Sequence, residues 1–211
     1  MKKKKTKKSV KKSVRKKAGK RGLGQEYKDA FKFIGESWNY ILFVVALFIL
    51  ISVSVFFGVQ NEQLNESFNE QLKQLILEFE GLGSLETIFK IFVNNVMASF
   101  LGIFLGVFFG LITLSFIFVN GYLIGYVMDL SVAANGLGVL WRLVPHGIFE
   151  LPAVLLSFAL GVKLGMFFLA KDPWEELKRR ARESLNVFIL IVVPLLVIAA
   201  IIEGILIVAV G

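Results

Sequence analysis

Hydrophobic residues form long uninterrupted runs in this chain, separated by shorter polar stretches. A helix of about 20 apolar residues is long enough to cross the hydrocarbon core of a bilayer. By this measure the pattern predicts membrane spans at about 38–58, 148–170 and 185–210, with Pro194 as a kink in the last. Residues 91–130 are apolar over about twice that length. We therefore expect two spans there, about 91–110 and 113–130, joined by a turn around Gly110 to Thr113.

The polar stretch between the first two spans, residues 60–90, is too charged to cross a membrane. Its apolar residues nevertheless recur at helical spacing, and they are Leu64, Phe68, Leu72, Leu75, Ile76 and Phe79. This spacing predicts an amphipathic helix over about 62–79 that ends near Gly81 and Gly83. The predicted fold is thus all-α: a polytopic transmembrane helical bundle of about five spans with an amphipathic helix outside the cytoplasm.

Basic residues set the expected orientation. Residues 2–21 contain 13 Lys and Arg and no acid, and a second basic stretch follows the fourth span at residues 171–182. Lys and Arg concentrate on the cytoplasmic side of a membrane. Five spans put both basic stretches in the cytoplasm, so we expect a multi-pass protein of the cell membrane with a cytoplasmic N-terminus and an extracytoplasmic C-terminus.

The N-terminal basic run has too few apolar residues to fold by itself. We expect residues 1–24 to be a disordered cytoplasmic arm and residues 25–211 to form one membrane domain. The arm's first lysines are expected to contact anionic lipid headgroups; these are Lys2, Lys3, Lys4 and Lys5. We expect no specific nucleic-acid partner, because a lysine run without aromatic residues is unspecific.

Small residues repeat at every fourth position in three of the predicted spans. They are Gly102, Gly106 and Gly110 in the second, Gly121 and Gly125 in the third, and Ala153, Ser157, Gly161 and Gly165 in the fourth. Such stripes let helix backbones approach closely within a bilayer. We expect them to serve helix packing within one subunit, with subunit contacts or a substrate path as alternatives, and on the same grounds we predict a homo-oligomer.

Polar residues within the spans are few, and a lipid-facing charge near the bilayer centre costs at least about 2.5–3.5 kcal/mol. Asn94, Asn95, Glu150 and Glu203 fall in the outer half of their predicted spans, and His146 directly precedes the outer end of the fourth. We therefore predict that these five residues form a polar cluster. Asn120, which interrupts the third span, is a further candidate site residue of this polar set. Lys163 lies toward the inner end of the fourth span, and its long side chain can snorkel to the cytoplasmic surface.

The chain has few groups for catalysis. It has no cysteine and one histidine, whereas a closed zinc site normally takes about four ligands. We expect no catalytic residue, no metal and no cofactor. The remaining enzymatic alternative is an intramembrane metal-dependent hydrolase built on His146 and Glu150, which are one helical turn apart.

Three sequence segments together resemble the stage II sporulation protein M family. They are IFVNNVMASFLGIFLGVFFG at 91–110, NGYLIG at 120–125 and HGIFELPA at 146–153, and the resemblance extends over about residues 38–210. It implies a multi-pass protein of about five spans. In spore-forming bacteria such a protein is the membrane scaffold of a complex that degrades peptidoglycan during engulfment, but members also occur in organisms that do not sporulate.

Residues and resemblance together favour a non-enzymatic scaffold or subunit of a membrane complex, with an extracytoplasmic protein as a possible partner. The alternative is a transporter or channel that handles ions or protons through the buried His, Glu and Asn side chains.

Overall fold

The computed structural model describes the backbone of residues 22–210. Outside the described part are residues 1–21, which include most of the predicted basic arm and Lys2 to Lys5, and the side chains at positions 75, 76, 79, 84, 141–146, 203, 204 and 206–210. The described residues form α-helices joined by short 3₁₀ turns and one π-helix, with no strand among them. The helices are α2 (Leu23–Glu36), α3 (Trp38–Phe56), α4 (Glu62–Phe79), α5 (Ser84–Phe104), α6 (Leu111–Asn135), α7 (Val144–Gly165), α8 (Pro173–Val187) and α9 (Val193–Val210).

Five helical stretches are long and apolar enough to cross a membrane, which confirms the predicted fold class. They are Trp38–Phe56, Leu85–Val107, Leu111–Asn135, Gly147–Leu169 and Pro173–Ile202. In the last stretch, charged residues continue through α8 as far as Glu183. Its apolar part therefore begins near Ser184, close to the predicted start of the fifth span. Helix α4 has the bounds predicted for the amphipathic helix.

Three local features differ from the predicted boundaries. Helix α5 already begins at Ser84, where the Gly83 N–H donates to the Glu86 carboxylate at 3.2 Å and so caps the helix. The turn into α6 lies at 105–110, before the predicted 110–113. It is made by the 3₁₀ turn Leu105–Val107 and by positive φ angles at Phe109 (56°) and Gly110 (74°). Helix α2 has no counterpart among the predicted elements.

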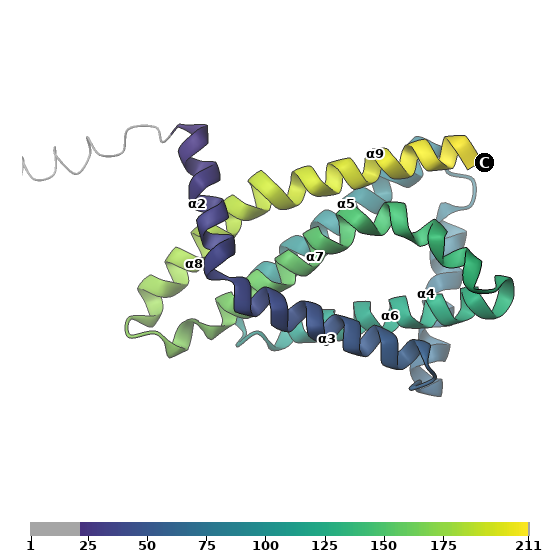
Figure 1. Cartoon of the computed structure of the whole chain (residues 1–211), viewed down its shortest axis with the longest axis horizontal. Coiled ribbons are helices and arrows are strands. Elements are labelled where there is room, and N and C mark those ends of the chain that lie inside the picture. Colours follow the sequence, from purple (N-terminus) through teal and green to yellow (C-terminus); the bar gives the residue numbers. More distant parts are fainter. Residues whose placement is uncertain (1–21, 211) are drawn as a thin grey trace, which may run out of the picture.

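The region of Pro194 contains a π-helix, Phe188–Val192, that joins α8 to α9. Proline lacks an N–H, and its ring clashes with the carbonyl group four residues earlier, here that of Leu190. The π-helix is wider than an α-helix, so it leaves room for the proline ring beside that carbonyl group and allows for the missing N–H. Helices α8 and α9 therefore continue one another through this junction (Figure 1).

Glycine contacts show which helices run in the same direction. Gly102 of α5 packs against Phe158 of α7, and Gly106, in the 3₁₀ turn that continues α5, packs against Gly161, so residue numbers rise together along these two helices. In the same way, Gly121 of α6 lies against Ile51 of α3, and Gly125 lies against Val55. Helices α5 and α7 are therefore parallel, and so are α3 and α6.

Helix α7 occupies the centre of the bundle and contacts α3, α5, α6 and α9. Its residues Phe158, Ala159 and Leu160 are completely buried. Helices α2 and α8 and the α5–α6 turn gather at one end of the bundle, which we call the α2–α8 end (Figure 1). Helix α4, the 3₁₀ segment Leu137–Leu143 and the C-terminal end of α9 lie at the other, the α4 end.

Candidate functional site

The closest helix contact in the bundle is a seam of glycines between α5 and α7. A Cβ atom added to Gly106 would overlap the Gly161 carbonyl group, and one added to Gly165 would lie 2.5 Å from the Gly106 carbonyl oxygen. With no side chains between them, the two backbones touch directly. The predicted stripes on the second and fourth spans thus face each other in the structure.

Helix α6 joins this seam through Thr113, which is completely buried. Its hydroxyl donates to the Gly102 carbonyl oxygen of α5 at 2.7 Å, and a Cβ atom on Gly161 of α7 would lie 2.8 Å from that hydroxyl oxygen. Gly102, Thr113 and Gly161 therefore form a node where three helices meet.

A second seam joins α3 and α6. Ser52 of α3 donates to the Gly121 carbonyl oxygen at 2.9 Å, while Gly121 itself faces the Ile51 side chain. Gly125 packs against the Ser52 carbonyl group and the Val55 side chain. The small residues of the third span therefore face larger residues of α3 and not another glycine stripe.

Lys163 lies at the junction of α7 with α2, where only 4% of its surface is exposed. Its ammonium donates to Ser37 Oγ at 2.9 Å and lies 3.8 Å from the centroid of the Phe33 ring. The Ser37 hydroxyl in turn donates to the Phe33 carbonyl oxygen at 2.6 Å. The amine therefore reaches the α2–α8 end, in the direction expected for snorkelling, but binds protein there.

Arginines of α8 complete this junction. Arg179 pairs with Glu36 of α2 at 3.2 Å and with Glu176 at 2.8 Å, while Arg180 donates to Glu176 at 2.7 Å and also to the Lys163 carbonyl oxygen. Hydrogen bonds from Arg179, followed by those from Arg180, hold the pKa of the Glu176 carboxyl well below its usual value. Charged contacts thus join α2, α7 and α8.

At the α4 end, amide groups hold the start of α4 against the bundle. Gln60 donates to Asp129 of α6 at 2.8 Å and accepts from Asn65 at 2.9 Å. The Tyr122 hydroxyl of α6 accepts from the Asn61 N–H at 2.7 Å and donates to Asn65 Oδ1 at 2.8 Å. These bonds join the first turn of α4 to α6.

Aromatic packing strengthens this contact. The Phe68 ring of α4 stacks on the Tyr122 ring with centroids 5.4 Å apart, and Phe68 is only 6% exposed.

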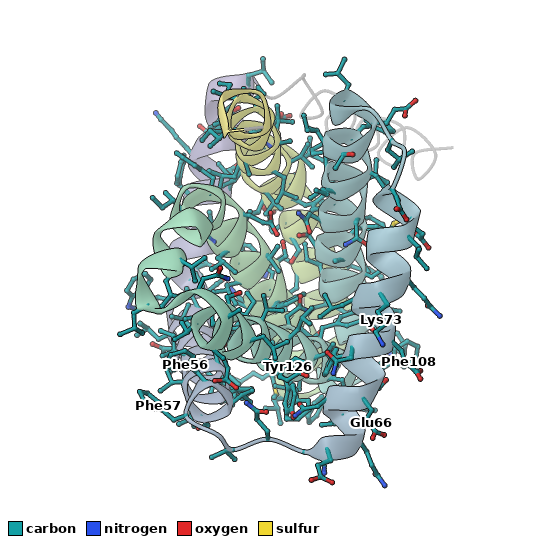
Figure 2. The ribbon with its side chains drawn as sticks, turned by 90° about the vertical axis from the view of Figure 1, so that its right-hand side faces the viewer. Phe56, Phe57, Glu66, Lys73, Phe108 and Tyr126 are labelled. Carbon is teal, nitrogen blue, oxygen red and sulfur yellow. The ribbon has the colours of Figure 1, made fainter. Side chains whose placement is uncertain are left out.

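The acidic residues of α4 lie mainly on its other side. Near the end of the helix, Glu78 pairs with Lys90 of α5 at 2.6 Å. Glu66 lies on the outer side of α4, away from the bundle (Figure 2). Glu62 and Glu70 are exposed as well. Helix α4 is therefore held on its apolar side and leaves its carboxylates in solvent.

The structure describes the side chains of three of the five residues in the predicted polar cluster. The side chains of His146 and Glu203 lie outside the described residues. Asn94 is exposed, whereas Asn95 and Glu150 are half-buried. Gly102 of α5 contacts Phe158 of α7. Asn94 precedes Gly102 by eight residues (102 − 94 = 8), and Glu150 precedes Phe158 by the same number (158 − 150 = 8). Since α5 and α7 are parallel, these two residues lie at a similar level. The cluster remains a prediction.

The Asn120 amide donates to the Phe116 carbonyl oxygen of its own helix at 2.8 Å. Ser157 likewise donates to Ala153 at 2.9 Å within α7. Among the described residues, no three His, Asp or Glu side chains gather closely enough to hold a metal ion.

Sequence reasoning missed the junctions at the two ends. The buried residues of α2, Ala30 and Phe33, are three positions apart, as expected for one face of a helix. That spacing was the available signal for α2. The partners of Tyr122 and Lys163 lie 57 to 126 positions away in the sequence, so no local pattern indicated them.

Comparison with known proteins gives two kinds of match. The family model for stage II sporulation protein M matches residues 40–206. An uncharacterized protein of Methanocaldococcus jannaschii is 30% identical over 171 residues, which are 78% of this chain and 76% of that protein. A second uncharacterized protein of the same organism is 33% identical over 122 residues, 54% of this chain and 66% of the relative. No solved structure matches the chain.

Proposed function

The chain belongs to the stage II sporulation protein M family, and from that premise we propose that this integral membrane protein is a non-enzymatic scaffold or subunit of a membrane complex. In this proposal the α2–α8 end lies in the cytoplasm, and helix α4 presents its carboxylates outside the cell to a protein partner. The orientation follows from the basic stretches that flank the α2–α8 end.

The observation that carries the proposal is how the polar groups of the spans are used. Ser52 and Thr113 bind backbone carbonyl groups of neighbouring helices, and Lys163 binds Ser37. Polar groups that hold helices together favour a rigid support over a path for solutes. The fixed position of α4 fits the same role, since a docking surface loses less entropy on binding when it is already ordered.

The first test addresses a protein partner of α4. The chain has no cysteine, so Glu66→Cys provides a single site for a photo-crosslinking label in native membranes. We expect a defined crosslinked protein that is lost when Glu62 and Glu70 are both changed to Gln. Lys178→Cys at the other end is the matched control and should not give that product. A product that persists after the Gln changes, or none from Glu66→Cys, would count against the proposed surface.

The second test addresses the transporter or channel alternative. That alternative draws support from the buried Ser99 hydroxyl of α5, which has no hydrogen-bond partner among the described residues, and from half-buried Glu150 on α7. Purified protein in sealed vesicles should show no proton or sodium flux above protein-free vesicles. Flux that His146→Ala or Glu203→Gln abolishes would replace the scaffold with a transporter.

A further inference from the structure

Helix α2 has apolar residues on two adjacent faces, only one of which packs on the protein. Ala30 is completely buried and Phe33 is 2% exposed, and they belong to the face in contact with the bundle. The other face has Leu23, Tyr27 and Phe31 at successive four-residue steps, and these are 70, 41 and 60% exposed. We call these three residues the α2 stripe. Four-residue steps place them above one another along the helix.

The remaining surface of α2 is polar. Gln25 and Lys32 lie on the side of the helix opposite the stripe, and both are exposed. Between α2 and α8 lies an open pocket of about 230 Å³, with Asp29, Lys32, Phe33, Glu36, Arg179 and Glu183 around it. The pocket borders the polar flank of α2, and among the described residues of this helix the stripe is the flank that exposes large apolar side chains.

The position of α2 shows what lies next to the stripe. Helix α2 runs across the direction of the spans at their end (Figure 1). Since spans cross the bilayer, a helix lying across their end follows the membrane surface. Helix α3 begins directly after the break at Ser37, and its first residue, Trp38, is 57% exposed. Trp is typical of the membrane–water interface, so the end of α2 that joins α3 lies at the level of that interface.

We propose that α2 is an in-plane membrane helix that inserts its stripe into an anionic lipid surface. The charge of the chain selects this occupant, because the 20 residues before Gly22 contain 13 Lys and Arg and no acid. Apolar insertion combined with a polybasic segment is the usual pair of signals for reversible binding to anionic membranes. The inference goes beyond the proposed function, since it holds equally for a scaffold and for a transporter.

The junction with α7 and α8 links this lipid contact to the bundle. Phe33 lies between two cations, with Lys163 Nζ 3.8 Å and the Arg179 guanidinium 5.7 Å from its ring centroid. Phe33 and the stripe are on one short helix, so α2 inserted in the membrane surface keeps Phe33 seated between them.

The test places a fluorescent label at single cysteines in the full-length protein, using Leu23→Cys and Phe31→Cys on the stripe and Gln25→Cys on the opposite side as the matched control. All three positions are exposed, so each variant should elute from size-exclusion chromatography like the unlabelled protein. The proteins are reconstituted into vesicles of phosphatidylcholine with or without phosphatidylglycerol. Quenching by spin-labelled lipids then reports whether each label lies among acyl chains.

We expect quenching at positions 23 and 31 to exceed that at 25 by at least about twofold in the phosphatidylglycerol vesicles, and to be weaker in phosphatidylcholine alone. Equal quenching at all three positions would overturn the in-plane helix. Equal quenching in both lipids would overturn the preference for anionic lipid. A stripe label shielded from water but not quenched by lipid would show that protein covers the stripe, and dependence of that shielding on protein-to-lipid ratio would identify a second copy.

Discussion

The two glycine seams of the bundle use the same residue type in different ways. Between α5 and α7, glycines face glycines, so backbone rests on backbone at Gly106 and Gly161. Between α3 and α6, glycines face the Ile51 and Val55 side chains and the Ser52 carbonyl group. A backbone cannot rotate away from an added methyl group, whereas a side chain often can. The comparison predicts that one substitution, Gly→Ala, has graded effects in the two seams.

The largest effect is expected for Gly161→Ala, at the node of three helices. The new methyl group would overlap the Gly102 carbonyl oxygen and lie 2.8 Å from Thr113 Oγ1. Helices α5 and α7 would have to separate and the Thr113–Gly102 hydrogen bond would break, at a cost of about 3 kcal/mol or more. Reversible unfolding in mixed detergent micelles, followed by circular dichroism, measures the change. A loss below about 1 kcal/mol would show that this seam is not close-packed.

An intermediate effect is expected for Gly125→Ala in the α3–α6 seam. The methyl group would overlap one carbonyl group, that of Ser52, and lie 2.9 Å from Val55 Cβ. The atoms nearest the new methyl group all belong to one helix, α3, whereas those at Gly161 belong to α5 and α6, so a small shift of α3 relieves part of the overlap. We expect a loss of about 2 kcal/mol in the same unfolding assay. A loss as large as that of Gly161→Ala would remove the distinction between the seams.

The smallest effect is expected for Gly121→Ala. Here the new methyl group would lie 3.2 Å from Ile51 Cγ2 and 3.4 Å from the Phe48 carbonyl oxygen. These contacts are only slightly tight, so a shift of α3 by a few tenths of an ångström relieves them, and alanine favours a helix over glycine by about 1 kcal/mol. The unfolding free energy should therefore change by less than about 1 kcal/mol. A loss above about 2 kcal/mol would show that Ile51 cannot adjust.

Gly35→Ala in α2 is the control for the whole series. No atom lies within 4 Å of the position its Cβ would take. We expect a change between zero and a gain of about 1 kcal/mol. A clear loss at this position would mean that the unfolding assay responds to something other than helix packing.

Much of the fold could be predicted from local sequence patterns. The number of spans follows from the lengths of the apolar runs, and the bounds of α4 follow from the spacing of Leu64, Phe68 and Leu72. The turn before α6 was placed a few residues late. The apolar run continues through the turn, and the positive φ at Phe109, a residue that rarely adopts it, leaves no signal in composition.

The candidate site was less predictable. The glycine stripes indicated close approach, but a glycine has no side chain that could indicate its partner, so the pairing of 102–110 with 161–165 was open. Lys163 was expected to reach the membrane surface, and the sequence had no feature that placed Ser37 and Phe33 beside it. Partners this far apart in the chain are brought together only by the packing of α2 and α7.

The sequence by itself determined the class of protein, the number of spans, the amphipathic helix at 62–79 and the family. Each of these depends on hydrophobic length, on helical period or on motifs, all of which are properties of neighbouring residues. Only the tertiary structure decided which glycine stripes meet, how α4 is held by Tyr122, and that α2 lies across the end of the bundle with an apolar stripe free. These features depend on contacts between distant segments, which form when the helices bury their surfaces against one another.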